Sequence, residues 1–501
     1  MTIRFHRVQT VGRGIRIMLF NSYIFILLFL PICILGYFFL NHLERQKAAQ
    51  IFLLAMSLWF YGFFNVSYLL IIIVSIAVNY AAYRLMMIWP GKRILFIVAL
   101  AFNLGMLFYF KYYDFFLENV NLLFHTDFAL KNILLPLGIS FFTFQQVSFV
   151  IDAYSRETPE YDFISYASFV AFFPQLVAGP IVTHKELIPQ FSDRERKRFN
   201  WDNFSRGIYI FVLGLGKKVL LADTFGNAVN WGFDNIAQLD TTNALIVMLS
   251  YTFQIYFDFS GYCDMAIGIG KMLNIDLPLN FNSPYKALTI NDFWKRWHIT
   301  LTRFFTKYLY IPLGGNRKGN LRTYVNTMIV FLVSGLWHGA NWTFVLWGGM
   351  HGLFIVISRH FKKFFDSLHP ALNWMITFSF VNVAWLFFRA NSVRDALRII
   401  YRIGRLDFTG INPNISECFD LVEFQWLFDR VFQCDILDIQ PFFFGIGFIL
   451  IAFVSLLGSK NAFEKMTDFK PTLERLLCVS LLLVWCVFSF SGISTFLYFN
   501  F

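Results

Sequence analysis

The stretch SGLWHGANWTFVLWGGMHG, residues 334–352, decides the class of fold. No Asp, Glu, Lys or Arg occurs between Arg322 and Arg359, so this part of the chain is apolar enough to enter a bilayer. It nevertheless contains His338 and His351. Burying an ionisable ring in a membrane is costly, and such a ring marks a functional site. His338 is therefore the first candidate for catalysis, and His351 is a candidate structural polar residue.

Spaced glycines surround both histidines. Gly335 and Gly339 flank the first, and Gly348 and Gly352 flank the second. Small residues four apart let another helix or a ligand approach the backbone closely. Basic residues at both ends of the stretch assign those ends to the cytoplasm. Two short helices that enter and return, with an apex at 339–341, would place the first histidine well inside the membrane.

The composition of the whole chain agrees with a membrane protein. Its 501 residues are 57% hydrophobic and 20% aromatic, with only 15% charged and a mean hydropathy of +0.56. Soluble proteins carry about 25% charged residues. The long apolar runs predict an all-α polytopic membrane protein rather than a β-barrel, which would show alternating segments of about ten residues. The net charge of +11 fits basic cytoplasmic loops and does not indicate nucleic-acid binding.

Apolar runs define the candidate membrane spans. Several central runs are short or contain Gly and Pro, as in LLPLGISFFTF (134–144), and broken helices at membrane depth are tolerated where they line a cavity. The candidate spans are 18–40, 51–64, 66–86, 94–113, 133–151, 163–181, 204–222, 243–272, 323–338, 342–358, 371–389, 442–458 and 473–490.

Three other regions complete the organisation. Residues 1–17 form a basic N-terminal extension ahead of a single membrane domain, 18–501, and either Met1 or Met18 can be the natural start. Residues 391–441 are a polar insert with an expected amphipathic surface helix. No charged side chain follows Arg475, which sends the C-terminus out of the cytoplasm. The tail ends in FLYFNF, residues 496–501, with Tyr498 as an aromatic anchor or a functional residue.

A second histidine lies in NDFWKRWHITLTRFFTKYLY, residues 291–310. Helical spacing predicts one interfacial helix with Arg296 on its cationic stripe and His298 on the apolar face. A lone histidine on such a face is more often a core residue than a ligand. The following motif, YIPLGGNRKG (310–319), adds Arg317 and Lys318, which suit an anionic donor arriving from the cytoplasm.

Two carboxylates lie in an apolar run, YFDFSGYCDMAIGIG, residues 256–270. Buried carboxylates need partners, and Arg296 or Lys271 is the expected partner for Asp258 and Asp264. Hydrogen bonding between packed helices is the favoured role. The sequence contains no HExxH, Walker A or GxSxG motif, which argues against a zinc protease, a P-loop enzyme and an α/β-hydrolase. No metal site is predicted.

Together these motifs resemble the membrane-bound O-acyltransferase family, in the branch of bacterial alginate O-acetyltransferase and its peptidoglycan- and cellulose-acetylating relatives. The most specific are FWKRWHITLTRFF (293–305) with the glycine motif that follows it, and the opening histidine stretch. MLFNSYIFILLFLPI (18–32) and QLVAGPIVTHKELIPQF (175–191) add support. The similarity covers 18–501, least in the insert.

The resemblance implies a fold and a set of roles. The fold would be a ring of about 11–13 transmembrane or re-entrant helices around a thinned centre pierced by a tunnel. His338 matches the family's catalytic histidine and His298 its donor-side histidine, while Tyr498 matches an acyl-accepting tyrosine in a C-terminal hexapeptide. Trp337, Asn341, Arg296, Arg317 and Lys318 are the expected donor-binding residues.

The expected activity follows from that resemblance. An acetyl group would pass from a cytoplasmic thioester, acetyl-CoA, across the bacterial inner membrane to an extracytoplasmic polysaccharide, with no bound cofactor. The tyrosine, a secreted SGNH-type partner, or both would carry it outward. The alternative is a transporter or polymer-export channel, which would use the same broken helices and buried polar groups without covalent chemistry.

Overall fold

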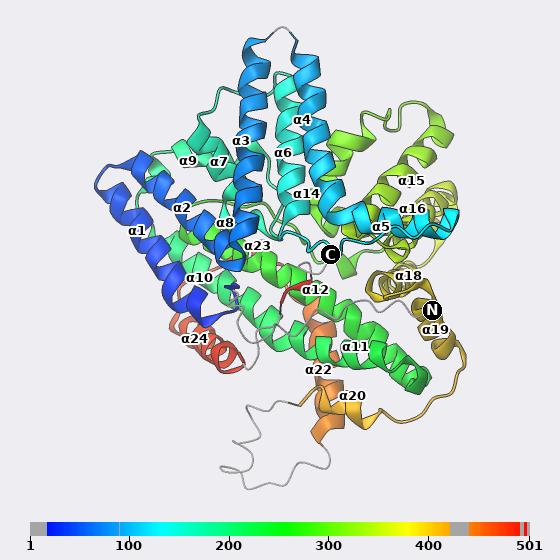
Figure 1. Ribbon diagram of the computed structural model, residues 1–501. Coiled ribbons are helices and arrows are strands. Elements are labelled where there is room, and N and C mark those ends of the chain that lie inside the picture. Colours follow the sequence, from blue (N-terminus) through cyan, green and yellow to red (C-terminus); the bar gives the residue numbers. More distant parts are fainter. Residues whose placement is uncertain (1–17, 90, 421–439, 491–494, 498–501) are drawn as a thin grey trace. The chain divides into compact units, whose positions relative to one another are not determined.

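The computed structural model describes residues 18–89, 91–420, 440–490 and 495–497. These residues form helices connected by loops, with no strand among them, so the all-α prediction is confirmed (Figure 1). Helical stretches within the described residues that are long and apolar enough to cross a membrane are Phe25–His42, Gln46–Phe64, Val66–Ile88, Lys92–Phe124 and Pro370–Arg389. The chain is therefore a multi-pass membrane protein.

The chain divides into two compact units. The first contains residues up to 211 together with 263–279, and the second contains 212–262 and 280–497. The division into a basic extension, one membrane domain and a tail stays a prediction. The helix expected in the polar insert is present as α19 (Val393–Gly404), which begins at an N-cap where the Ser392 side chain accepts a hydrogen bond from the Asp395 amide.

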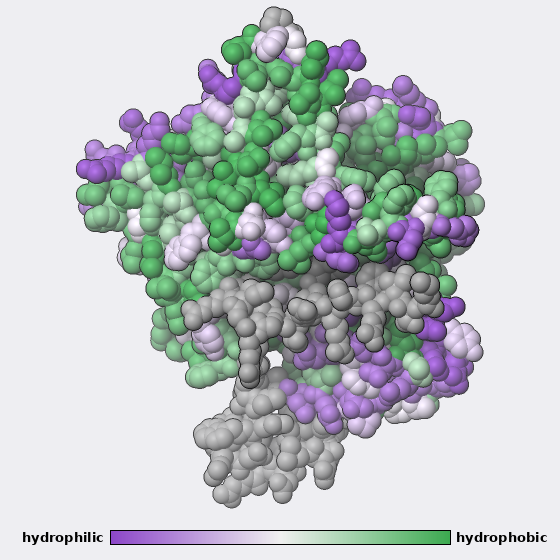
Figure 2. Space-filling model, viewed as in Figure 1, coloured by the Kyte–Doolittle hydropathy of each residue, from purple (hydrophilic) through white to green (hydrophobic). Residues whose placement is uncertain are grey.

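Apolar helices build the first unit. Exposed hydrophobic residues such as Leu70, Val74, Ile94 and Val98 cover the outer faces of α3 and α4, which are hydrophobic in Figure 2. Between these two helices Asn79 and Asn103 exchange amide hydrogen bonds. The elements are η1 (Phe25–Phe29), α1 (Leu30–His42), α2 (Gln46–Phe64), α3 (Val66–Ile88), α4 (Lys92–Leu107), η2 (Phe108–Tyr112), α5 (Tyr113–Phe124), α6 (Ile139–Tyr154), α7 (Phe163–Ala171), α8 (Phe173–Leu176), α9 (His184–Ser192), η3 (Glu195–Lys197) and most of α10 (Trp201–Gly216).

Two of the glycine- and proline-containing spans are shorter helices than expected. Helix α6 begins only at Ile139, after Gly138 at a φ of +69°, and α7 ends at Ala171 before the short α8. A Cβ at Gly138 would lie 2.7 Å from the carbonyl oxygen of Leu176, so the two breaks pack against each other. The predicted interruption of these spans is thus confirmed.

The second unit contains both histidine motifs. Its elements are η4 (Lys217–Ala222), α11 (Asp223–Asp234), η5 (Ile236–Gln238), the first two-thirds of α12 (Thr241–Met272), η6 (Pro284–Lys286), α13 (Ile290–Arg296), α14 (Ile299–Phe305), η7 (Thr306–Tyr310), α15 (Gly319–His338), α16 (Trp342–His360), α17 (Lys362–Ser367), α18 (Pro370–Arg389), α19, α20 (Pro413–Glu417), α22 (Gln440–Leu457), α23 (Ala462–Thr467) and α24 (Leu473–Phe488).

Helices α15 and α16 form the expected hairpin, with its turn at 339–341. Their backbones touch at two of the predicted glycines. A Cβ at Gly335 would lie 2.3 Å from the carbonyl oxygen of Phe344, and one at Gly348 would lie 2.2 Å from that of Phe331. No side chain fits at either contact, because carbonyl oxygens of a helix cannot move aside. The glycines fix the distance between the two helices and so the position of His338 at the end of α15.

Adding one methyl group at this contact is expected to destabilise the protein. Gly348→Ala would force the helices apart, at a cost of about 1–3 kcal/mol of unfolding free energy. Gly349→Ala is the matched control, since its Cβ meets only a Leu332 methyl at 3.7 Å. Thermal unfolding of detergent-purified protein checks both variants: Gly348→Ala should lower Tm and Gly349→Ala should not. Equal Tm values would show that the contact tolerates a side chain.

Candidate active site

The fold brings the two motif histidines together. His338 ends α15 and His298 lies between α13 and α14, and their ring centroids are 6.5 Å apart. Both side chains are buried, at 3% and 0% exposed. Two imidazoles from distant parts of the sequence thus share one buried space, as the resemblance implied.

The segment carrying His298 differs from the expected single helix. Helix α13 ends at Arg296, and His298 has φ 45° and ψ 53°, in the left-handed region. The reason is Asn280, whose backbone carbonyl accepts the Ile299 amide at 3.0 Å and whose side chain accepts the Thr300 amide at 3.2 Å. These amides are therefore not directed along a continuous helix. Left-handed backbone at a non-glycine residue costs about 1–3 kcal/mol and is concentrated at functional sites.

Asn280 also determines the tautomer of His298. Its Oδ1 accepts hydrogen bonds from the amide and the hydroxyl of Thr300, the latter at 3.0 Å, so this oxygen is an acceptor. It lies 3.2 Å from His298 Nδ1, which must therefore carry the proton. Burial lowers the pKa of His298 to about 3, so the ring is neutral and Nε2 holds the lone pair. Sequence reasoning missed Asn280, which begins the turn NFNSPYKALTI.

Aromatic rings enclose His338. The rings of Trp337, Trp347 and Phe388 meet it nearly edge to face, with centroid distances of 4.9, 5.1 and 5.1 Å. The Trp337 ring also lies 6.1 Å from that of His298. This tryptophan, predicted to bind the donor, therefore borders both imidazoles. An apolar enclosure favours a neutral imidazole over an imidazolium.

His351 lies behind the pair. Trp294 Nε1 donates to His351 Nδ1 at 3.2 Å and thereby connects α13 to α16. The imidazole is fully buried among rings that include Phe380 and Trp347. A neutral imidazole that accepts at Nδ1 carries its proton on Nε2. The geometry agrees with the structural role predicted for His351.

A cavity of about 400 Å³ adjoins the histidine pair. Its lining includes Ser334, one turn before His338, and Leu301, one turn after His298, and Lys295 and Arg359 supply its cations. Its other lining residues are Asn291, Trp294, Thr302, Phe305, Thr306, Tyr310, Thr327, Val330, Phe331 and Ile355. Neither imidazole lines the cavity, but residues one helical turn from each of them in the sequence do.

The cations predicted to meet the donor lie elsewhere. Arg296 Nε donates to both carboxylate oxygens of Asp292, at 2.9 and 3.0 Å. Arg317 and Lys318 are exposed in the loop before α15 and do not line this cavity. Lys295, the neighbour of Arg296 on α13, lines the cavity instead. A donor role for Arg296, Arg317 and Lys318 stays a prediction.

Asn341 has a structural position at the hairpin turn. Its side-chain oxygen accepts the amide of Thr343 at 3.0 Å and caps α16, and its side-chain nitrogen donates to the carbonyl of Asn391 at 3.3 Å. Both ends of this amide thus have a structural partner, and a donor-binding role for Asn341 stays a prediction. In the described part of the chain, no three His, Cys, Asp or Glu side chains group closely enough to hold a metal ion.

A buried ion pair holds the C-terminal tail. Lys218 Nζ lies 2.8 Å from Asp258 Oδ1 and 2.7 Å from Asp223 Oδ1. The same ammonium donates to the carbonyl of Thr495 at 3.2 Å, and Asp258 Oδ2 accepts the amide of Leu497 at 2.9 Å. The partner of Asp258 is thus Lys218, and the expectation of Arg296 or Lys271 is wrong. Lys218 lies forty residues earlier, so no local spacing could identify it.

The ring of Phe496 completes this anchor. It is 1% exposed, lies 4.8 Å beneath the Lys218 ammonium and meets the Tyr262 ring edge to face at 4.9 Å. Phe259, the next residue on α12 after Asp258, lies 4.8 Å from the His298 ring. One stretch of α12 therefore contacts both the tail and the histidine pair. Asp264 is buried farther along this helix, and Tyr498 lies outside the described residues.

Comparison with known proteins identifies the family of this chain. The model of the MBOAT, membrane-bound O-acyltransferase family, matches residues 115–393, a segment that includes both histidines. A peptidoglycan O-acetyltransferase from Helicobacter pylori is 41% identical over 97% of this chain and 98% of its own length. A probable alginate O-acetylase AlgI from Pseudomonas aeruginosa is 39% identical over 76% of this chain and 74% of its own.

A more distant relative is named for a different activity. A teichoic acid D-alanyltransferase from Streptococcus thermophilus is 27% identical over 44% of this chain and 56% of its own length. The family model and the long, similar relatives are decisive, because they cover the helices that position both imidazoles. The chain is an acyltransferase and belongs to the membrane-bound O-acyltransferase family.

Proposed function

We propose that this protein transfers an acetyl group from a cytoplasmic thioester, acetyl-CoA, toward the O-acetylation of an extracytoplasmic polysaccharide. The observation that carries the proposal is the buried histidine pair, with a cavity nearby whose lining includes two cations, Lys295 and Arg359. The relatives named as a peptidoglycan O-acetyltransferase and a probable alginate O-acetylase support acetyl as the group and a polysaccharide as the final acceptor.

The chemical step needs one base. His338 takes the proton of the incoming hydroxyl as its oxygen attacks the thioester carbonyl carbon. The carbon–sulfur bond then breaks, and the imidazolium returns the proton to the departing thiolate, so that an ester and a free thiol remain. A buried neutral imidazole suits this role, because it is already unprotonated when the hydroxyl arrives.

His298 orients the donor in this proposal. Asn280 fixes its ring through Nδ1, so Nε2 presents a lone pair that can accept a hydrogen bond from an N–H or O–H group of a substrate without reorienting. The cavity with Lys295 and Arg359 admits the phosphate-bearing end of the donor from the cytoplasmic side, where positive residues gather. Trp337, whose ring borders both imidazoles, provides an apolar surface for the acetyl group.

Tyr498 is the proposed first acceptor. The support is the anchor just before it: Thr495, Phe496 and Leu497 are bound to Lys218 and Asp258 beside the helix segment that contacts His298. A C-terminal segment that only anchored the last helix in the bilayer would not need a buried ion pair to hold it. A phenol with an ordinary pKa near 10 is a better leaving group than an aliphatic hydroxyl, so its acetyl ester can pass its cargo on.

An SGNH-type partner outside the inner membrane would receive the acetyl group and place it on the polymer. The C-terminus lies on that side in this proposal, since the basic residues before α24 remain cytoplasmic. The transporter alternative needs none of this chemistry. Membership of an acyltransferase family favours the enzyme, and covalent transfer is what separates the two.

The test is transfer of label in inside-out membrane vesicles. With acetyl-CoA labelled in the acetyl group, the protein should release free CoA and place label on its own C-terminal peptide, which mass spectrometry identifies. Intact labelled acetyl-CoA inside the vesicles, with no acetylated peptide or polymer, would favour the transporter.

Replacing Tyr498 by Phe distinguishes a tyrosine that accepts the acetyl group from one that only anchors the chain in the membrane. Phe keeps the aromatic ring but has no hydroxyl, so we expect polymer acetylation to fall about 100-fold or more while the amount of folded protein is unchanged. Tyr401→Phe, on the exposed face of α19, is the matched control and should acetylate normally. Normal acetylation by Tyr498→Phe would remove the tyrosine from the pathway.

A further inference from the structure

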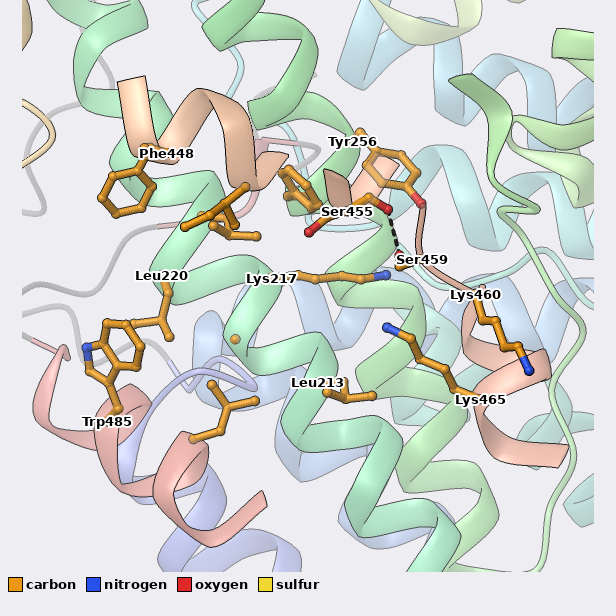
Figure 3. Close-up of a pocket in the computed structure, with 16 residues that line it drawn as sticks. Leu213, Lys217, Leu220, Tyr256, Phe448, Ser455, Ser459, Lys460, Lys465 and Trp485 are labelled. Carbon is orange, nitrogen blue, oxygen red and sulfur yellow. Dashed lines mark hydrogen bonds between the residues drawn. The ribbon is translucent and has the colours of Figure 1, made fainter. Parts of the chain in front are cut away.

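A second cavity, of about 460 Å³, lies within the second unit away from both histidines. Helices α10, α12, α22 and α24, together with η4 and the segment around α23, line it (Figure 3). None of the residues around His298 and His338 lines it. A cavity of this size is in the range of ligand sites, about 300–1,000 Å³.

One end of the cavity is cationic. Figure 3 shows the amino groups of Lys217 and Lys465 directed toward the same region beside Ser459. Lys286 Nζ donates to the carbonyl of Ser459 at 3.1 Å, which adds another positive charge there. Lys460 also lines this end, although its ammonium is paired with Asp468 at 2.5 Å. The end therefore favours an anionic group.

The rest of the cavity is a hydrocarbon surface. Its walls include Leu213, Leu220, Leu221, Phe448, Ile451, Leu482 and Trp485. Gly447 opens one wall, since a Cβ built there would have no atom within 4 Å. A ligand that satisfies both parts must carry its negative charge at one end of an apolar chain.

The surroundings point to the bilayer as the source of that ligand. Leu450 and Val454 on α22, and Leu481 and Val484 on α24, are exposed apolar side chains on the two helices that line the cavity. Such faces contact lipid. The basic segment from Lys460 to Arg475 is assigned to the cytoplasmic surface by its charge, and anionic lipids of that leaflet attract lysines.

We propose that this cavity binds one anionic phospholipid of the cytoplasmic leaflet. Its phosphate lies between Lys217 and Lys465, and one acyl chain follows the apolar wall past Gly447. A coenzyme thioester fits less well, because most of its length is polar whereas the cavity wall is apolar. The proposal is independent of the acetyl-transfer mechanism, since it uses no residue of the histidine site.

The site has a structural consequence for the tail anchor. Lys217 and Phe257 line the cavity, and their neighbours in sequence, Lys218 and Asp258, form the buried pair that binds the tail. A lipid in the cavity would contact η4 and α12, the two elements that carry this pair. Occupancy is therefore expected to raise the Tm of the protein.

Lipid binding to the full-length protein tests the proposal. Delipidated protein would be mixed with vesicles of phosphatidylcholine containing phosphatidylglycerol, or of phosphatidylcholine alone, and native mass spectrometry would count retained lipids. We expect one retained phosphatidylglycerol per chain and a higher Tm with it. Lys465→Ala should weaken retention about fivefold, as for one lysine near a membrane surface. Lys470→Ala, an exposed lysine outside the cavity, is the matched control.

A second variant tests the proposal in case Lys465→Ala does not fold or does not change lipid retention. Gly447→Phe fills the open wall and should abolish retention, with the same elution profile as the parent protein in detergent. Equal retention of phosphatidylglycerol by Gly447→Phe and the parent would overturn the proposal. Retention of phosphatidylcholine equal to that of phosphatidylglycerol would also overturn it. So would displacement of the lipid from the parent protein by acetyl-CoA, at concentrations that displace no lipid from Lys465→Ala.

Discussion

His338→Ala is expected to reduce acetyl transfer by about 10²–10⁴-fold, the usual contribution of a positioned general base. The ring is buried at the end of α15, 6.5 Å from His298, and no other imidazole of the described residues has its place between Trp337 and Trp347. Without it, the attacking hydroxyl keeps its proton and is a poor nucleophile. Release of free CoA and labelling of the C-terminal peptide measure the loss.

A matched control lies in the same hairpin. His360→Ala removes an exposed imidazole at the far end of α16 and should leave transfer unchanged. Both variants should keep the Tm of the parent within a few degrees, because the aromatic enclosure of His338 remains. Full transfer by folded His338→Ala would remove this histidine from the mechanism, whatever the role of the tail.

Lys218→Met is expected to have the largest effect on the structure. Removing one partner of a buried ion pair costs about 3–5 kcal/mol, because the remaining charge has no compensation. Here two carboxylates, Asp223 and Asp258, would lose the same ammonium. The Thr495 carbonyl would also lose its donor, so the tail should dissociate from α12. Acetyl transfer to the C-terminal tail should then fall together with the free energy of unfolding.

Hydrogen exchange distinguishes loss of the anchor from general unfolding. The Leu497 amide, which donates to Asp258, should exchange rapidly in Lys218→Met, while the amides of α15 and α16 stay protected. Lys271→Met is the control, since the Lys271–Asp276 pair is partly exposed and worth about 0–1 kcal/mol. Slow exchange at Leu497 in folded Lys218→Met would show that the ion pair does not hold the tail.

Local patterns predicted the helices and the glycine contact. Apolar runs set the class of protein and most helix positions, because a bilayer requires continuous hydrophobic segments whatever their neighbours are. Gly335 and Gly348 were identifiable for a similar reason, since a close backbone approach has only one chemical solution. The break at His298 was not predictable from the 3.6-residue period, because its cause is Asn280, eighteen residues earlier.

The sequence alone determined that the chain is a helical membrane acyltransferase and that His298 and His338 belong to its two most specific motifs. Only the tertiary structure decided that these rings lie 6.5 Å apart, that Lys295 rather than Arg296 faces the adjoining cavity, and that Lys218 is the partner of Asp258. The physical reason is range. Hydrophobicity and helical period act between neighbours in the chain, whereas a buried charge or an imidazole is satisfied by whichever group the packed helices bring within about 3 Å.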